Sequence, residues 1–216
     1  KAFVLTQASW GVGSPQLRNR GTVVGNLVTA SPANDTISPL MVLDAKLALL
    51  STRGERIVPL SDFYTGVRKT VMEPDEVVTD IFFDAPGKDT QTYFTRMILR
   101  KTVAISVTNV SVVLRFEGEK VKQANITLGA AAPTNIHADA AEDYLEGKLL
   151  TDEVIAETSR LAAEATRPIS DLRGSAEYRR YMIEVLAKRG LTAIRDGVDK
   201  DEVPSNPVTL MMGGEE

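Results

Sequence analysis

The segment from Gly13 to Asp35 constrains this chain more than any other, because it concentrates small residues, hydroxyls and amides between two apolar runs. Thr22, Gly25 and Asn26 fall in one expected turn, and Asp35 follows on the next loop. Glycine has no Cβ and tolerates positive φ, so it lets main-chain N–H groups approach phosphate oxygens. The turn therefore predicts a phosphate site, with Asp35 as an acceptor for a sugar or amide group. Taken alone, the same turn also fits an ordinary loop between strands.

Composition excludes several classes of function. The 216 residues are 43% apolar, which allows a sizeable core in one large domain or two smaller ones. The net charge of −4, with no cationic block, argues against a surface for nucleic acid or anionic membranes. No apolar run approaches the roughly 20 residues that span a bilayer. We expect a folded cytoplasmic protein, and because the chain begins with Lys1 rather than Met, we expect that this is not its native terminus.

The chain has no cysteine and a single histidine, His137. It therefore supplies no thiolate for an iron–sulfur cluster, a Cys-rich zinc site, a disulfide or a nucleophile. We expect His137 to be a surface or capping residue ahead of a helix rather than a catalytic base.

Short β-like runs alternate with turns in the first region of the chain. The expected elements are the end of a helix at residues 3–8, a strand at 23–29, a short buried helix at 37–45, a hairpin of 46–51 and 56–60, a helical turn at 62–66 and a strand at 76–83. The polar residues 84–89 are rich in breakers and predict a domain boundary. We therefore divide the chain into a first domain at 1–88, a second domain at 89–203 and a tail at 204–216.

The second region predicts a three-stranded antiparallel sheet followed by helices, and hence an α+β fold. The strand-like runs are residues 91–99, 104–116 and 121–129, with Gly118 in the last turn. Thr151 is the expected N-cap of a helix that ends at Pro168. One face of this helix holds Val154, Thr158, Leu161 and Ala165. The last helix carries an amphipathic stripe, which we interpret as core rather than as a cofactor-binding motif. The stripe consists of Tyr178, Tyr181, Met182, Val185 and Leu186.

Residues 12–49 closely resemble the second flavin motif of the FAD-binding subunit of molybdenum hydroxylases, the family of xanthine dehydrogenase, aldehyde oxidase and aerobic carbon monoxide dehydrogenase. That motif is an Arg-Asn-x-Gly approach, then a hydroxyl residue followed by two glycines and an asparagine. The approach here is Arg18-Asn19-Arg20-Gly21, and the motif is Thr22-Val23-Val24-Gly25-Asn26. Val24 thus replaces the first of the two glycines, and a β-branched residue resists positive φ.

The second region resembles the small C-terminal domain of the same flavin subunit. The similar pieces are residues 128–130, 132–133, 141–147 and 170–179. Within the last piece, Arg173 and Arg179 lie beside Asp171, and we interpret the three as an ion-pair cluster that locks the entry to the last helix. The resemblance implies the second lobe of a xanthine-dehydrogenase/vanillyl-alcohol-oxidase-type FAD-binding domain, followed by a C-terminal domain with a three-stranded antiparallel sheet and helices.

Two further departures from the family pattern accompany the resemblance. Family members begin with a first flavin lobe whose Gly-rich turn grips the pyrophosphate from the other side, and that lobe has no counterpart here. We therefore expect a fragment, a processed product or one piece of a split subunit. The family also has an Asp-Ile-Ala triplet near the flavin, where this chain has Ala104, Ile105 and Ser106.

The resemblance implies electron transfer rather than acid–base work on a substrate. In the family, molybdopterin in a large subunit hydroxylates the substrate, and iron–sulfur clusters in a small subunit relay electrons to FAD, which passes them to NAD or another acceptor. By resemblance, the pyrophosphate of FAD would lie on Thr22, Val23, Val24, Gly25 and Asn26. Asp35 would bind the polar portion of the flavin, Val78 would pack on its ring, and Arg96 stands where the family often has a lysine.

The sequence leaves open two hypotheses from other classes of function. The chain could be a scaffold that has lost FAD and only joins partner subunits. It could also be a binding module unrelated to flavin, in which the Gly-containing turn is purely structural. Flavin absorbance of the purified protein separates both from the first reading.

Overall fold

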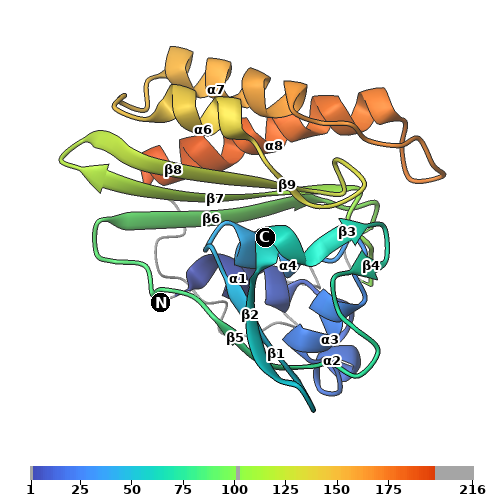
Figure 1. Cartoon of the computed structure of the whole chain (residues 1–216). Helices are drawn as coiled ribbons and strands as arrows, with labels where there is room; N and C mark the ends of the chain where they lie inside the picture. The colour runs from blue at the N-terminus through green and yellow to red at the C-terminus, as the bar shows by residue number, and fades with distance from the viewer. Residues whose placement is uncertain (1, 101–102, 198–216) are drawn as a thin grey trace.

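The structure is a computed structural model that describes residues 2–100 and 103–197. Its elements form three layers, with an antiparallel sheet between a layer of three helices and the first part of the chain (Figure 1). The first part contains α1 (Phe3–Trp10), α2 (Pro15–Arg18), α3 (Val23–Val28), α4 (Ile37–Met41), β1 (Lys46–Ser51), β2 (Gly54–Pro59), α5 (Leu60–Phe63), β3 (Tyr64–Gly66), β4 (Lys69–Thr70) and β5 (Val77–Phe82). The second part contains β6 (Thr90–Met97), β7 (Thr108–Glu117), β8 (Lys120–Gly129), β9 (Ile136–His137), α6 (Asp139–Leu145), α7 (Asp152–Glu164) and α8 (Ala176–Asp196).

The first part is built on the sheet β2-β1-β5, in which both pairings are antiparallel. The predicted hairpin is confirmed, with Ser51 paired to Gly54 at its turn, and β5 confirms the strand predicted at 76–83. Helix α4 confirms the short buried helix, since its five residues are all buried. The helical turn predicted at 62–66 lies earlier, in α5, and the chain is already extended from Tyr64.

The strand predicted at residues 23–29 is wrong, because this segment forms α3. Its two adjacent valines favour a strand by propensity, but the Thr22 hydroxyl accepts the Gly25 N–H at 2.9 Å and caps a helix. Helical spacing then places Val23 and the fully buried Leu27 on the same core. Val24 and Gly25 are therefore right-handed helical, and the expected need for positive φ in this turn is not met.

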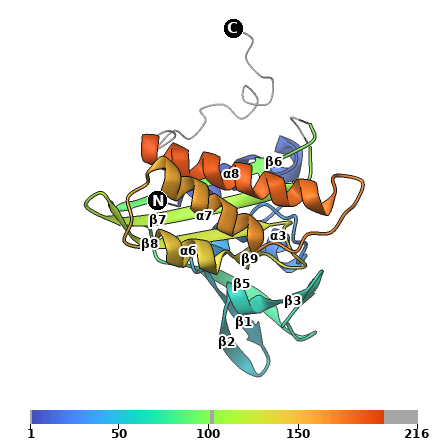
Figure 2. The same ribbon diagram turned by 90° about the horizontal axis from the view of Figure 1, so that it is seen from above.

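The second part contains the three predicted strands in the order β6-β7-β8, and the short β9 adds a fourth at the β8 edge. Strand β9 has two residues, too few to show an alternating pattern in the sequence. Figure 2 shows α6, α7 and α8 lying across this sheet, while β1 and β2 project beyond it.

Strand β7 is buried on both faces, which positions the polar site described below. Val110, Val112 and Leu114 enter the core beneath α6, α7 and α8. Residues of the opposite face, including Asn109 and Ser111, lie against α4. Successive side chains of a strand point to opposite faces, so the sequence of β7 supplies an apolar face and a partly polar one.

Helix α7 begins as predicted, but α7 and α8 bury faces that differ in part from the predicted ones. The Thr151 hydroxyl accepts the Val154 N–H at 3.3 Å and confirms the N-cap of α7. Of the stripe predicted on this helix Thr158 is fully buried, and the remaining three members are partly buried at the core margin. In α8, Met182 and Leu186 are buried as predicted, but Tyr181 is 62% exposed, so the tyrosines of the stripe are not core.

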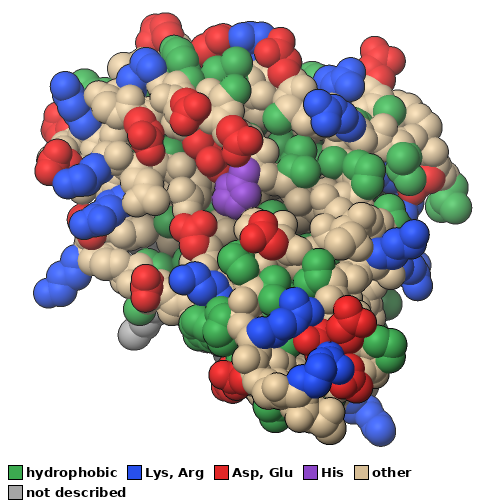
Figure 3. All heavy atoms as spheres, viewed as in Figure 1, with side chains coloured by type: hydrophobic (Ala, Val, Ile, Leu, Met, Phe, Trp, Pro, Cys, Tyr) green, Lys and Arg blue, Asp and Glu red, His purple; other side chains and the backbone are tan. Residues whose placement is uncertain are grey.

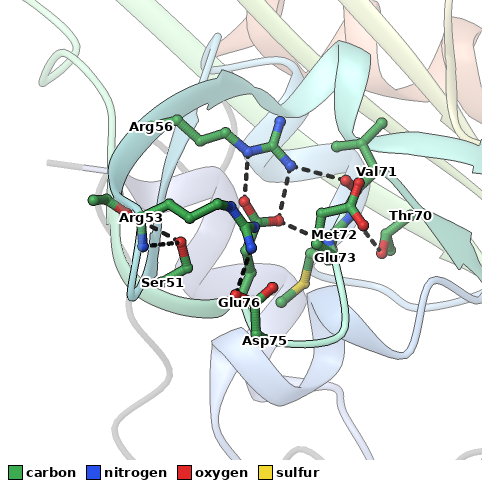
Figure 4. Close-up of polar contacts among 10 residues, drawn as sticks. Ser51, Arg53, Arg56, Thr70, Val71, Met72, Glu73, Asp75 and Glu76 are labelled. Atoms are coloured by element: carbon green, nitrogen blue, oxygen red, sulfur yellow. Dashed lines mark hydrogen bonds and ion pairs between the residues drawn. The ribbon is translucent and has the colours of Figure 1, made fainter.

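Charged side chains tie the β1–β2 hairpin to the turn that precedes β5 (Figure 4). The Arg56 guanidinium donates to both oxygens of Glu76, and the neighbouring Arg53 pairs with Asp75 at 2.6 Å. Among the described residues, none of the helices has the length and apolar character that crossing a membrane requires.

Candidate functional site

The N-terminus of α3 presents a surface of hydrogen-bond donors. The Thr22 hydroxyl holds the Gly25 N–H, while the first-turn N–H groups of Val23 and Val24 precede any residue that could accept them within the helix. Gly25 is exposed, and a Cβ added to it would meet the Thr22 hydroxyl oxygen at 3.1 Å. A side chain at position 25 would therefore stand over the donors, which glycine leaves accessible.

Asn26 joins α3 to the loop that follows it. Its side-chain oxygen accepts the Thr36 hydroxyl, and its main-chain carbonyl accepts Asn34 Nδ2 at 2.6 Å and the Thr29 hydroxyl at 2.9 Å. These bonds hold the loop against α3, and they bring Asp35, the neighbour of Thr36 in the chain, close to this helix.

Asp35 lies at the centre of a buried polar network. Its side chain is 6% exposed, and Oδ2 accepts Arg96 Nη1, while Oδ1 accepts the Ser106 hydroxyl and, at 3.3 Å, Asn109 Nδ2. Burial raises the pKa of Asp35 above its ordinary value, although the Arg96 charge and the three hydrogen bonds act in the opposite direction. A carboxylate offers about four acceptor sites, and Oδ2 accepts only Arg96 Nη1 among the described residues, so one of its acceptor sites has no protein partner.

Arg96 is held from two sides and faces inward. Its side chain is 14% exposed, Nη1 donates to Asp35, and Nη2 donates to the Gly11 carbonyl at 2.7 Å. The structure thus pairs two residues that the sequence named separately.

The network continues through residues that sequence reasoning missed. The Ser38 hydroxyl donates to Asn109 Oδ1 at 2.6 Å and accepts from the Ser111 hydroxyl, and the Thr127 hydroxyl donates to the Ser38 carbonyl. All four side chains are fully buried. The one signal available was the polar spacing of Asn109 and Ser111 inside an otherwise apolar strand, which indicates a buried polar face when both faces are covered.

The structure therefore brings the predicted Thr22–Asn26 segment, Asp35 and Arg96 into one connected region. Val78 lies on β5 and packs against the core that Val23 also contacts, outside the hydrogen bonds of that region. Ser106, from the segment that replaces the family triplet, supplies a hydroxyl to Asp35.

Comparisons with known proteins identify the family. The model of the FAD binding domain in molybdopterin dehydrogenase matches residues 2–86, and that of the CO dehydrogenase flavoprotein C-terminal domain matches residues 93–194. The nicotinate dehydrogenase FAD-subunit of Eubacterium barkeri is 32% identical over 199 residues, which are 90% of this chain and 67% of that protein. This chain belongs to the FAD-binding subunits of the molybdenum hydroxylases.

Solved structures agree with this assignment. The reconstituted CO dehydrogenase from Oligotropha carboxidovorans matches with a TM-score of 0.84 and 31% identity, over 88% of this chain and 66% of that one. Quinoline 2-oxidoreductase from Pseudomonas putida 86 matches with a TM-score of 0.82 and 26% identity, over 89% and 66%. This member of the family spans about two thirds of the length of the relatives that it matches.

The residues present fit the FAD of this oxidoreductase family. A pyrophosphate needs several N–H or O–H donors, and the exposed start of α3 offers them without a side chain on Gly25. Val24 replaces the usual glycine without backbone strain, because its conformation is right-handed helical.

Proposed function

We propose that this chain is the flavin subunit of a molybdenum-containing hydroxylase, and that it passes electrons from iron–sulfur clusters in a partner subunit through FAD to NAD or another acceptor. The observation that supports this most directly is the open, donor-rich start of α3 beside the buried Asp35 network. The names of the relatives support the same reading, since they include a nicotinate dehydrogenase FAD-subunit and a carbon monoxide dehydrogenase medium chain.

Each residue of the site has a separate part in binding FAD. The N–H groups of Val23 and Val24, with Thr22, Gly25 and Asn26, would hold the pyrophosphate with little help from cationic side chains. Asp35 would accept a hydrogen bond from the polar portion of the flavin through the acceptor site on Oδ2 that no protein group uses. Val78 would pack on the ring, and Arg96 would fix Asp35 near it. FAD when bound supplies the redox chemistry, and the protein binds and orients it.

The proposal includes the partners of the complex and its compartment. The chain has no cysteine, so it offers no thiolate to an iron–sulfur cluster. A small iron–sulfur subunit and a large molybdenum-binding subunit would hold the other centres, in the cytoplasm. Co-purification from the native host tests this: iron, molybdenum and oxidised-flavin absorbance should accompany the chain. A free monomer without any of the three would contradict the proposal.

A substitution at Gly25 tests the pyrophosphate contact. Gly25→Val should lower the flavin content of the complex about tenfold or more, because it adds bulk over the Thr22 hydroxyl where phosphate would approach. Lys46→Ala is the control, since Lys46 is exposed at the start of β1. A Gly25→Val complex that assembles and retains full flavin would refute the assignment.

A further inference from the structure

Arg179 is a buried cation at the start of α8 that reaches across the end of the sheet. Its residue is 2% exposed. Nη1 donates to the main-chain carbonyl of Val107 and, at 3.4 Å, to that of Ala130, while Nη2 donates to Asp171 Oδ1 at 2.7 Å. One side chain therefore connects α8 with the segment before β7 and the segment after β8.

Both carbonyls belong to residues that are linked to the surroundings of Asp35, one through its neighbour in the chain and the other through a main-chain hydrogen bond. Ser106, which donates to Asp35 Oδ1, is the neighbour of Val107 in the chain. The Ala130 N–H donates to the Pro32 carbonyl at 2.8 Å, on the loop that leads to Asp35. Arg179 thus binds the carbonyl of Val107, the residue next to Ser106. It also binds the carbonyl of Ala130, whose N–H bonds to the loop of Asp35.

Arg179 shares the Asp171 carboxylate with Arg173, in the turn that precedes α8. The Asp171 carboxylate accepts the Arg173 N–H and the Arg173 guanidinium, both at 2.8 Å, which confirms the predicted ion-pair cluster. A Cβ on Gly174 would lie 3.5 Å from Val107, so the turn packs closely on the same segment that Arg179 holds. Burial acts to raise the pKa of Asp171, but the hydrogen bonds of Arg173 and Arg179 outweigh it and lower the pKa to about 2.

Arg179 is not needed to neutralise Asp171 in the turn before α8. Arg173 already neutralises Asp171 with a side chain that is 30% exposed, whereas the Arg179 side chain is 3% exposed and extends past Asp171 to the two carbonyls. A guanidinium can bind several acceptors in fixed directions at once, which a shorter or apolar side chain cannot do.

We infer that Arg179 is a positioning residue of the flavin site, which holds the carbonyls of Val107 and Ala130 so that Ser106 and Pro32 keep the Asp35 loop in its binding conformation. This inference rests on the proposed function of the same site. It extends the functional unit to α8, although α8 lies on the far side of the sheet from α3 and α4 (Figure 1).

The test compares Arg179→Met and Arg179→Lys with Arg173→Met in the intact complex. Arg173→Met removes an arginine from the same ion-pair cluster without touching either carbonyl. Two quantities are measured: the dissociation constant of FAD, from flavin fluorescence, and amide hydrogen exchange of residues 30–36 in the flavin-stripped complex. Arg179→Met should speed exchange in this loop and weaken FAD binding about tenfold, Arg179→Lys should lie between it and the wild type, and Arg173→Met should change neither.

The outcomes separate the two hypotheses. A wild-type complex that binds no FAD contradicts the proposed function, whereas a wild type that binds FAD with the same affinity as both Arg179 variants overturns the inference. If Arg179→Met does not fold, Arg179→Lys is combined with Ser106→Ala. Effects on FAD affinity that are less than additive support a route through Ser106, and additive effects overturn it.

Discussion

The Arg56 guanidinium donates two hydrogen bonds to the Glu76 carboxylate, from Nε at 2.6 Å and from Nη2 at 2.8 Å. Glu76 also accepts the Glu73 N–H at 2.8 Å, and its side chain is 3% exposed. The pair therefore fastens strand β2 to the turn before β5, within the part of the chain that contains the candidate site.

This arrangement predicts a defined acid sensitivity. The hydrogen bonds from Arg56 and Glu73 lower the pKa of Glu76 from 4.5 to about 2. A lowered pKa in the folded state contributes stability above the ordinary pKa, and this contribution is lost as the pH falls from about 4.5 towards 2. Glu76→Gln should be less stable than the wild type at pH 7, and the gap should close over that interval in urea unfolding.

Asp75→Asn is the matched control for Glu76→Gln. The Arg53–Asp75 pair lies beside the Arg56–Glu76 pair, but its side chains are 60% and 41% exposed, and exposed pairs contribute about 0–1 kcal/mol. Equal losses in the two variants at pH 7 would mean that the Arg56–Glu76 pair, with its buried carboxylate, stabilises the fold no more than the exposed pair does.

A second pH effect is predicted at His137, which the structure places partly buried rather than on the open surface. Its Nδ1 lies 2.9 Å from Glu142 Oε1, and acidic side chains surround it (Figure 3). Burial acts to lower the pKa of His137, but the hydrogen bond and charge of Glu142, with Asp44 and Asp139, raise it above 6.5.

A raised pKa means that His137 stabilises the fold fully below about 6.5 and loses this effect as the pH rises through the folded-state pKa. His137→Gln should therefore cost about 1 kcal/mol at pH 6 and less at pH 9. Chemical unfolding at several pH values checks this. Because the chain has one histidine, a gap that widens with rising pH would show that the sign is wrong.

The sequence predicted those elements whose causes are local. The hairpin and the Thr151 cap depend on residues a few positions apart, and both are present. The error at α3 has a local cause too, because the propensity of two valines was weighed above the capping hydroxyl of Thr22. The boundary predicted at 88–89 stays a prediction, and the tail at 204–216 lies outside the described residues.

The network around Asp35 could not be predicted from any local pattern. Its partners Arg96, Ser106 and Asn109 lie 61, 71 and 74 positions away in the chain, so they meet only in the folded structure, where α4 packs against β7 and β8. The resemblance to the flavin subunits pointed to Asp35 and to Arg96 separately, but it could not show that the two side chains form an ion pair. Ser106 lies in the segment where the family pattern is lost, and the resemblance assigned it no part.

A third prediction concerns Gly129, whose missing side chain makes room for Asn109. A Cβ there would lie 2.6 Å from Asn109 Cγ, in a fully buried position where the amide also contacts Ser38 and Asp35. Gly129→Ala should cost about 2 kcal/mol in the free energy of unfolding, because the amide must move from its partners. In Gly66→Ala the nearest side-chain atom would be 3.9 Å away, so this control should change stability by less than about 0.5 kcal/mol.

The last prediction uses two threonines that cap helices in the same way. Thr22 accepts the Gly25 N–H at 2.9 Å, and Thr151 accepts the Val154 N–H at 3.3 Å, each from the third helical residue. Replacing either by valine removes the capping hydroxyl and should cost about 1 kcal/mol in stability. Thr22→Val should in addition weaken FAD binding about tenfold, because the proposed site loses its hydroxyl donor and the order of α3. Thr151→Val, far from that site, should bind FAD like the wild type. Measuring FAD affinity and urea unfolding for both variants separates loss of a ligand contact from loss of a cap, and equal FAD affinities in the two would remove Thr22 from the site.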